Sequence, residues 1–280
     1  MTTVSPPVNP VAMSSSSLNR TSRGLLPDLL RSEWTKLRSV PSTSWTLLVA
    51  AVATIGLGAL FCVIYVSRYG KPSPFHRVTF DPTSYSLSGI MLAQLAVAVL
   101  GVLVISSEYS TGMIRTTLTA VPQRRTLFAA KALVFTATIL VIGIASCFGA
   151  FFLGQAVLSG HHLETTIGSP GVLRAVVGAG LYLGVLGLLS LGLGALLRST
   201  AGAIAAVVGL VLVLPGLAAA LPPSWANAID KYLPSNAGQA IFHVHTQAHM
   251  LSPWAGFAVF CAYAAAALVG AGYLLHRRDA

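Results

Sequence analysis

Three histidines near the C-terminal end are the first candidates for chemistry in this sequence. The stretch HVHTQAH places His243, His245 and His249 within seven residues, and a helix would set the last two on one face. Two imidazoles with no acidic residue or cysteine close by make an incomplete zinc site. A second polar group, HHLE at residues 161–164, offers no better set of ligands. We therefore expect no metal site and interpret these histidines as ordinary surface residues.

Motifs for hydrolysis or nucleotide binding do not occur in the sequence. It contains no HExxH and no GxSxG. The only Gly-Lys pair is Gly70-Lys71, and Pro72 follows where a phosphate-binding loop requires Ser or Thr. We therefore expect that this chain is not an enzyme and has no ATPase site of its own. An active site built from the outer histidines remains a weaker alternative.

A charged stretch, SSEYSTGMIRTTLTAVPQRRTLFAAK at residues 106–131, lies between two long apolar runs. From Glu108 onward the pattern predicts a short helix at the membrane surface, with Tyr109 and Met113 on one face. Pro122 ends this helix because the residue before a proline disfavours the helical region. A surface helix tied to two membrane spans would act as a lever for a docking partner. The alternative is an ordinary basic loop that serves topology alone.

The elements that position these residues are predicted to be membrane helices. The chain has 280 residues, of which 55% are hydrophobic and only 9% charged, whereas an ordinary globular domain carries about 25% charged residues. A hydrocarbon core of about 30 Å requires about 20 apolar residues in a helix, and only helices satisfy the backbone there. We predict an all-α integral membrane protein with six transmembrane helices. The apolar runs lie near 45–66, 86–106, 132–157, 175–197, 201–221 and 253–275.

The net charge of +10 is mainly a signal of topology. Most Lys and Arg residues fall on the side of the termini and the 106–131 loop, so the positive-inside rule places both termini in the cytoplasm of a multi-pass protein of the cell membrane. We expect lipid as a partner and no nucleic acid. Residues 1–24 are rich in Ser and Pro, which predicts a disordered tail rather than a cleaved signal peptide. The membrane domain then takes up residues 25–280.

Residues 25–39, LLPDLLRSEWTKLRS, predict a basic amphipathic helix that lies along the inner membrane surface. Pro27 followed by Asp28 suits the start of this helix. Pro41 is expected to break the chain before the first span. A linker with a chance pattern is the alternative. The residues that we assign to this interfacial helix as functional are Glu33, Trp34, Lys36 and Leu37.

Small residues recur at four-residue spacing in two of the spans. Gly180 and Gly184 form one such row, and Ser146, Ala150 and Gly154 form another. Rows of this kind let helix backbones approach closely in a membrane. They predict a tightly packed bundle or a dimer, with packing inside the chain as the default interpretation.

Polar residues and a proline interrupt the apolar spans. Gln94 and Gln155 are candidates for a substrate pathway, although a hydrogen bond between helices is the favoured interpretation for neutral amides. A proton- or sodium-driven carrier would place ionisable residues at mid-depth, and the sequence lacks them there. Pro215 should bend or break the fifth span. The segment 221–254 then predicts short helices that re-enter the outer face before the last span.

Three segments resemble one transporter family. EYSTGMIRTTLTAVPQRRTLFAAK at 108–131 looks like the loop between the second and third spans of ABC-2 type transporter permeases. SEWTKLRSVPSTSWTLL at 32–48 is similar to the entry segment of these permeases, especially the actinobacterial ones. YLPSNAGQAIF at 232–242 resembles the segment before their last span. The resemblance covers about residues 25–278.

The resemblance implies the transmembrane permease subunit of an ATP-driven exporter. Two permease chains, expected to be identical, would pair above two cytoplasmic ATPase chains that bind ATP and magnesium, so this chain would hold no cofactor. It also implies a coupling helix at about 108–120 and re-entrant outer helices within 222–250. Together with the apolar face of the loop, the expected coupling and ATPase-contact residues are Glu108, Tyr109, Gly112, Met113, Arg115, Leu118, Pro122 and Arg125.

The resemblance does not identify the cargo. The expected function is efflux of a substrate such as a drug or an antibiotic. The alternatives are a membrane anchor that holds an ATPase for sensing or immunity without transport, and an intramembrane enzyme.

Overall fold

The computed structural model describes residues 22–69, 80–110, 124–222, 225, 228–245 and 250–277. Within these ranges the regular structure is entirely helical, and six helical segments are long and apolar enough to cross a membrane. The predicted all-α integral membrane fold is confirmed. The six segments are α2 (Pro41–Arg68), α4 (Ile90–Ser110), α6 (Arg124–Ser159), α7 (Val172–Leu197), α8 to α9 (Thr200–Ala219) and α12 (Pro253–Arg277).

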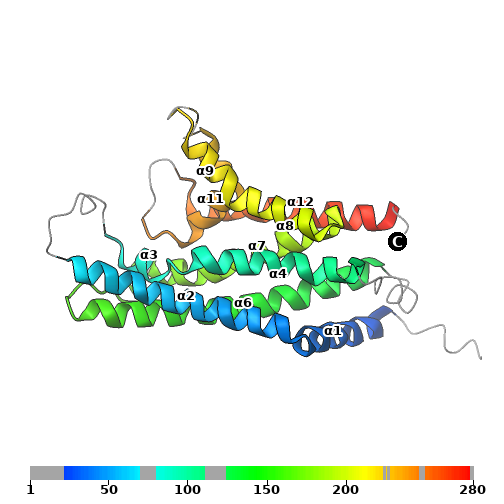
Figure 1. Ribbon diagram of the computed structural model, residues 1–280, viewed down its shortest axis with the longest axis horizontal. Helices are drawn as coiled ribbons and strands as arrows, with labels where there is room; N and C mark the ends of the chain where they lie inside the picture. The colour runs from blue at the N-terminus through cyan, green and yellow to red at the C-terminus, as the bar shows by residue number, and fades with distance from the viewer. Residues whose placement is uncertain are drawn as a thin grey trace, which may run out of the picture.

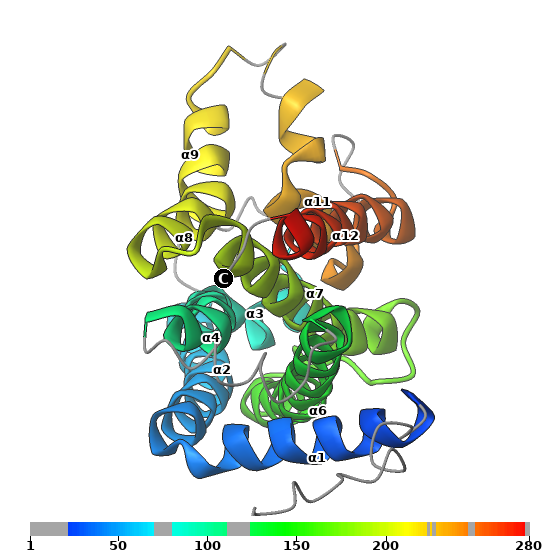
Figure 2. The same ribbon diagram turned by 90° about the vertical axis from the view of Figure 1, so that its right-hand side faces the viewer.

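The long helices run side by side, and α7 lies at the centre of the bundle (Figures 1 and 2). It contacts α4, α6 and α12, and it is the most deeply buried of the six spans. Helix α1 (Ser22–Ser39) instead lies across one end of the bundle, below the ends of α2 and α6 in Figure 2. A basic amphipathic helix in this position fits the membrane interface, as the sequence predicts.

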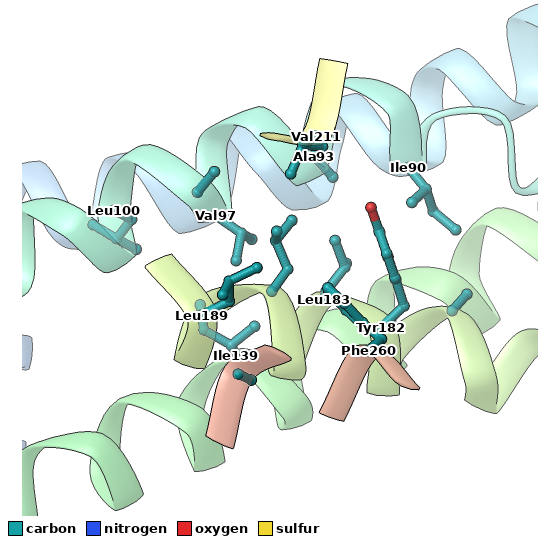
Figure 3. Packing of buried hydrophobic residues seen from close by; sticks show 14 of the residues in the cluster. Ile90, Ala93, Val97, Leu100, Ile139, Tyr182, Leu183, Leu189, Val211 and Phe260 are labelled. Carbon is teal, nitrogen blue, oxygen red and sulfur yellow. The ribbon is translucent and has the colours of Figure 1, made fainter. Parts of the chain in front are cut away.

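The main core lies where α4, α6, α7 and α12 meet, and Figure 3 shows its side chains converging on α7. Small residues bring the helices close together there. A Cβ atom on Gly180 would lie 2.9 Å from the Cα atom of Ile144 in α6, and one on Gly184 would lie 2.6 Å from the Cδ2 atom of Leu140. The first small-residue row therefore serves packing within the chain, as expected.

The second small-residue row also packs inside the chain. Gly58 of α2 faces the Cβ atom of Ala150, and Gly154 lies against Ser86 and Cys62. These contacts join α2, α6 and the short helix α3 (Pro82–Ser86). Close approach of backbones is what small residues allow where lipid offers little hydrophobic drive to association.

The second span differs from its predicted limits at both ends. Residues 87–89 form a turn after α3, so α4 starts at Ile90 rather than at 86. Gly89 permits this turn because its Cα atom lies against the backbone of Thr54, where a Cβ atom would collide. At the other end α4 continues to Ser110. Glu108 and Tyr109, where the sequence predicts the start of the surface helix, thus belong to α4. The rest of that predicted helix lies outside the described residues and stays a prediction.

The fifth span bends at the place where the sequence predicts a disturbance. It consists of α8 (Thr200–Val208), the π-helix η3 (Gly209–Val213) and α9 (Leu214–Ala219). Pro215 has no N–H to donate to the carbonyl of Val211, and a π turn is one way in which a helix absorbs such a loss. In Figure 1, α9 turns away from the line of α8.

Short helices precede the last span, as the sequence predicts. They are η4 (Asp230–Tyr232), α11 (Pro234–Gln239) and η5 (Ala240–Phe242). Helix α11 packs on α12, with Gly238 against the rings of Phe260 and Tyr182. These elements lie toward the end of the bundle that is remote from α1 (Figure 1).

The start of the interfacial helix also differs from the prediction. Helix α1 begins at Ser22, so Pro27 lies inside it rather than at its first turn. Pro27 removes one backbone hydrogen bond of the helix, a loss that costs about 3 kcal/mol in a helix interior and that the packing of α1 on the bundle must offset. The predicted break is confirmed, since Val40 is extended and Pro41 is the first residue of α2.

Candidate functional site

Helix α1 is fixed to the bundle by an apolar contact with the start of α6. Leu29 of α1 packs on Leu127 and Ala130 of α6, and all three side chains are buried. Only Val40 separates α1 from α2, so the chain turns sharply between them. The polar side of this contact faces the end of α4, where residues from three helices meet.

These residues form a buried ion cluster, which consists of Glu33 and Lys36 of α1, Glu108 of α4 and Lys131 of α6. The Lys131 Nζ atom donates to Glu33 Oε2 at 2.7 Å and to Glu108 Oε1 at 2.8 Å. The Lys36 Nζ atom lies 2.8 Å from Glu33 Oε1 and 3.4 Å from Glu108 Oε1. The side chains of Glu33, Glu108 and Lys131 are 3%, 6% and 5% exposed, whereas that of Lys36 is 40% exposed.

The ion cluster is electrically balanced, with two carboxylates and two ammonium groups. Burial alone would raise the pKa of Glu33, but the charge and hydrogen bond of Lys131, supported by Lys36, lower the pKa below its usual value. Burial alone would lower the pKa of Lys36, but its hydrogen bond to Glu33 and the two negative charges raise it. Buried charges persist only when they are paired in this way. These two shifts keep Glu33 and Lys36 charged near neutral pH.

Two of the buried members stand on either side of the 111–123 segment. Glu108 is in the last turn of α4, and Lys131 is in the second turn of α6, so the cluster clamps both helices to α1. Removing one member would leave an uncompensated buried charge, which typically costs about 3–5 kcal/mol. The arrangement can thus make α1, α4 and α6 respond together to a force on that segment.

A second contact extends from the end of α4 to the junction of α7 and α8. The Arg198 guanidinium carbon lies 5.2 Å from the centroid of the Tyr109 ring, which is a cation–π geometry. Arg198 ends α7 in the left-handed region with a φ of 52°, and Ser199 caps α8 by accepting from the N–H of Gly202. The same end of the bundle is therefore tied together across five helices.

A family model described as ABC-2 family transporter protein matches residues 29–224, which include every member of the ion cluster. The chain belongs to the ABC-2 transporter family. No match is found among curated proteins. This ABC-2 permease is a multi-pass membrane subunit of a transporter, and the family implies an ATPase partner on a separate chain.

The structure brings together some of the predicted functional residues of the permease. Glu33, Lys36 and Glu108 meet in the ion cluster, while Trp34 is 49% exposed and Leu37 packs against the main core. Other predicted coupling residues lie outside the described residues, as does the side chain of Arg125, and their roles stay predictions. These are Gly112, Met113, Arg115, Leu118 and Pro122.

Gln94 of the permease lies in a contact between helices. The Tyr182 hydroxyl of α7 donates to Gln94 Oε1 at 2.7 Å, and the Tyr182 ring stacks on Phe260 of α12. Figure 3 shows Tyr182 directed from α7 toward α4. This geometry is that of a hydrogen bond between helices, and the assignment to a substrate pathway stays a prediction.

Gln155 joins the C-terminal end of α6 to α3. Its Nε2 atom donates to Ser86 Oγ at 3.0 Å, and its Oε1 atom accepts from the backbone N–H of Thr165 at 2.8 Å. The amide is buried and bonded on both sides, so it holds the loop after α6 against the bundle. Its assignment to a substrate pathway also stays a prediction.

Among the residues that the structure describes, His243 and His245 form no metal site, because no three His, Cys, Asp or Glu side chains come close enough to hold a metal ion. The backbone carbonyl of His243 accepts from Arg174 at 2.7 Å. Burial lowers the pKa of His243, although the charge of Asp81 opposes this effect. His249 lies outside the described residues.

Lys131 is the member of the ion cluster that the sequence does not single out as a candidate site residue. It is the last residue of the charged stretch 106–131, and its position relative to the apolar residues indicates a buried ion pair. Lys131 stands within the apolar stretch FAAKALVF, at the start of a long span. A lysine at such a position must either reach water or find a carboxylate. Glu108 and Glu33 were the acids available near the same end of the bundle.

Proposed function

We propose that this ABC-2 permease is the membrane subunit of an ATP-driven exporter and that the ion cluster couples a partner ATPase to the spans. The observation that carries the proposal is the buried Lys131 ammonium, which bridges Glu33 and Glu108 across three helices. We further propose that two identical permease chains pair above two ATPase chains on the cytoplasmic side.

Coupling would start at the segment between α4 and α6. A push from the ATPase on this segment reaches Glu108 and Lys131, which are bonded to each other. Lys131 is also bonded to Glu33 of α1. Because breaking these bonds strands a buried charge, the three helices move as one body. Since α4 and α6 also pack on α7, the motion reaches the centre of the bundle.

We propose an apolar or amphipathic cargo such as a drug or an antibiotic. A groove of about 580 Å³ between α6, α7 and α12 supports this class, since ligand sites are typically about 300–1,000 Å³ and mostly apolar. Its lining includes Phe128, Leu140, Leu188 and Leu268. The groove lies beside the core that the coupled helices would move.

The test is to purify the tagged permease from its native membranes and to identify the proteins bound to it. An ATPase with a Walker motif at about one copy per permease is the expected result. The complex is then placed in vesicles, where ATP should drive uptake of a fluorescent amphipathic drug into inside-out vesicles. A stably folded permease that retains no ATPase would contradict the proposal. An ATPase without transport of any tested cargo would favour the non-transporting anchor.

Lys131→Gln in the same assay separates coupling from assembly. The ATPase should still bind, because its contact lies on the loop, but ATP hydrolysis should no longer drive uptake. Lys36→Gln is the matched control. Because the Lys36 side chain is partly exposed to solvent, this variant should leave most of the transport intact. Equal transport by both variants would refute a coupling role for the ion cluster.

A further inference from the structure

A groove between α1, α2 and α6 has a polar end and an apolar end. Its volume is about 390 Å³. The polar end is built from the last turns of α1 and the first turn of α2, and the apolar end from the following turns of α2 and from α6. The residues at the polar end are Trp34, Leu37, Arg38, Thr43 and Ser44, and those farther along are Leu47, Leu48, Ala51, Thr138 and Ile142.

Thr43 has an unused hydroxyl in this groove. Its side chain is only 8% exposed, and its hydroxyl makes no hydrogen bond to any residue that the structure describes. Neighbouring threonines return their hydroxyls to their own helices, since Thr46 donates to the carbonyl of Ser42 and Thr138 to that of Val134. Thr43 lacks this option because the residue four positions earlier belongs to α1. The Thr43 hydroxyl is therefore available to a ligand in the groove.

The polar end of the groove favours an anion. Arg38 lines it with an exposed guanidinium, and the N-terminus of α2 adds partial positive charge without a side-chain cap at Val40. Lys36 does not contribute to this field, because it is neutralised by Glu33 and Glu108. The groove lining contains no acidic residue. Charge complementarity therefore selects a negatively charged group.

The groove also has the orientation that a bilayer component requires. Helix α1 lies across the end of the bundle and α2 runs along it (Figures 1 and 2). The groove is lined by both helices, so in a membrane it would pass from the interface toward the hydrocarbon depth. Trp34 at its mouth is typical of the headgroup level. A soluble anion would leave the apolar floor exposed, and a neutral apolar molecule would leave Arg38 and Thr43 unused.

We propose that this groove binds one anionic phospholipid, whose phosphate is held by Arg38 and Thr43 and whose acyl chain lies along Leu47 and Ala51. The bound lipid would join α1, α2 and α6 beside the ion cluster and would hold α1 in place from its membrane side. This lipid site does not depend on the proposed coupling to an ATPase, because it requires only the permease in a membrane.

The experiment uses Trp34 as a local probe. Trp45, Trp225 and Trp254 are replaced by Phe, which should do little harm because all three are largely exposed. The full-length protein is placed in phosphatidylcholine vesicles that contain a minor fraction of brominated phosphatidylglycerol, or the same fraction of brominated phosphatidylcholine. We expect stronger quenching of Trp34 by the anionic lipid. Equal quenching by the two lipids would overturn the proposal.

Variants show whether the groove itself is responsible. Arg38→Gln should weaken the preference for the anionic lipid about fivefold, because the guanidinium no longer pairs directly with the phosphate in the groove. Thr43→Val should weaken it by a smaller factor, since the shape is kept and only the hydroxyl is lost. Arg31→Gln is the matched control on the same helix outside the groove lining and should change nothing. An equal loss in Arg31→Gln and Arg38→Gln would show a general surface charge and refute the site.

A second measurement covers the case in which a variant fails to fold. Native mass spectrometry of the unaltered permease, released from detergent, should show one retained phosphatidylglycerol in preference to phosphatidylcholine. A bulky residue in the floor of the groove, Ala51→Trp, should remove this lipid. No retained anionic lipid on the unaltered protein, or retention that persists in folded Ala51→Trp, would refute the proposal.

Discussion

Lys131 of α6 and Glu33 of α1 are separated by 98 positions in the sequence, yet the lysine Nζ atom lies 2.7 Å from the Glu33 Oε2 atom. Both side chains are almost completely buried, so this is an ion pair without water to screen it. The pair fixes an interfacial helix to a membrane span at the side of the loop where an ATPase partner would dock. This relationship leads to the first two predictions.

Lys131→Gln should destabilise the permease by about 3–5 kcal/mol, because two buried carboxylates lose their shared partner. Thermal unfolding in detergent measures this loss. Lys36→Gln should cost no more than about 1 kcal/mol, since an exposed ion pair contributes little. Similar melting temperatures for Lys131→Gln and the unaltered protein would contradict the burial of the ion cluster.

The double variant Glu108→Gln/Lys131→Gln should be more stable than the sum of the single effects predicts. Each single change leaves a buried charge without its partner, whereas the double change removes one negative and one positive charge together. Additive effects in the cycle would show that the two side chains do not interact.

The stability of the permease should fall at both acidic and alkaline pH. The pKa of Glu33 is lowered in the folded protein, so its contribution is complete above its ordinary value of 4.5 and is lost as the pH falls below it. The pKa of Lys36 is raised, so its contribution is complete below 10.5 and is lost as the pH rises above that value. A curve of melting temperature against pH tests both the fall at acidic pH (the acidic arm) and the fall at alkaline pH (the alkaline arm). Glu33→Gln should flatten both arms, because the raised pKa of Lys36 depends on Glu33. Lys36→Gln should flatten the alkaline arm and leave most of the acidic arm, because Lys131 contributes more than Lys36 to the lowered pKa of Glu33.

Gly180→Ala should destabilise the bundle by about 1–3 kcal/mol, which is the usual cost of overpacking. The added Cβ atom would lie 2.9 Å from the backbone of Ile144, so α6 and α7 would have to separate. Gly272→Ala in α12 is the matched control, because a Cβ atom there meets nothing within 4 Å. Equal melting temperatures for the two variants would show that α6 and α7 do not approach as closely as the structure has them.

Gly112→Pro should leave membrane insertion intact and abolish ATP-driven transport. A proline in the loop stiffens the segment on which the partner would push, while the spans are untouched. Gly112→Ala is the control and should retain transport. Full transport by a well-expressed Gly112→Pro protein would refute the lever mechanism.

The sequence alone determined the membrane class, the six spans and the interfacial helix, because each rests on a pattern within one segment. Apolar length predicts a span, and the bend near Pro215 follows from a missing N–H group. The loop after the second span carried the family resemblance. The spans, the amphipathic helix and the bend each depend on residues that are close together in the sequence, so they can be predicted without knowledge of the tertiary structure.

The tertiary structure decided what the charged residues do. Glu33 looked like a polar residue on a surface helix, and Lys131 like the end of a basic loop, until the fold buried both in one cluster. The groove of Arg38 and Thr43 likewise exists only because α1 turns sharply against α2 and α6. Ion pairs and grooves are made by segments far apart in the chain, and their energy depends on burial, which a single sequence does not specify.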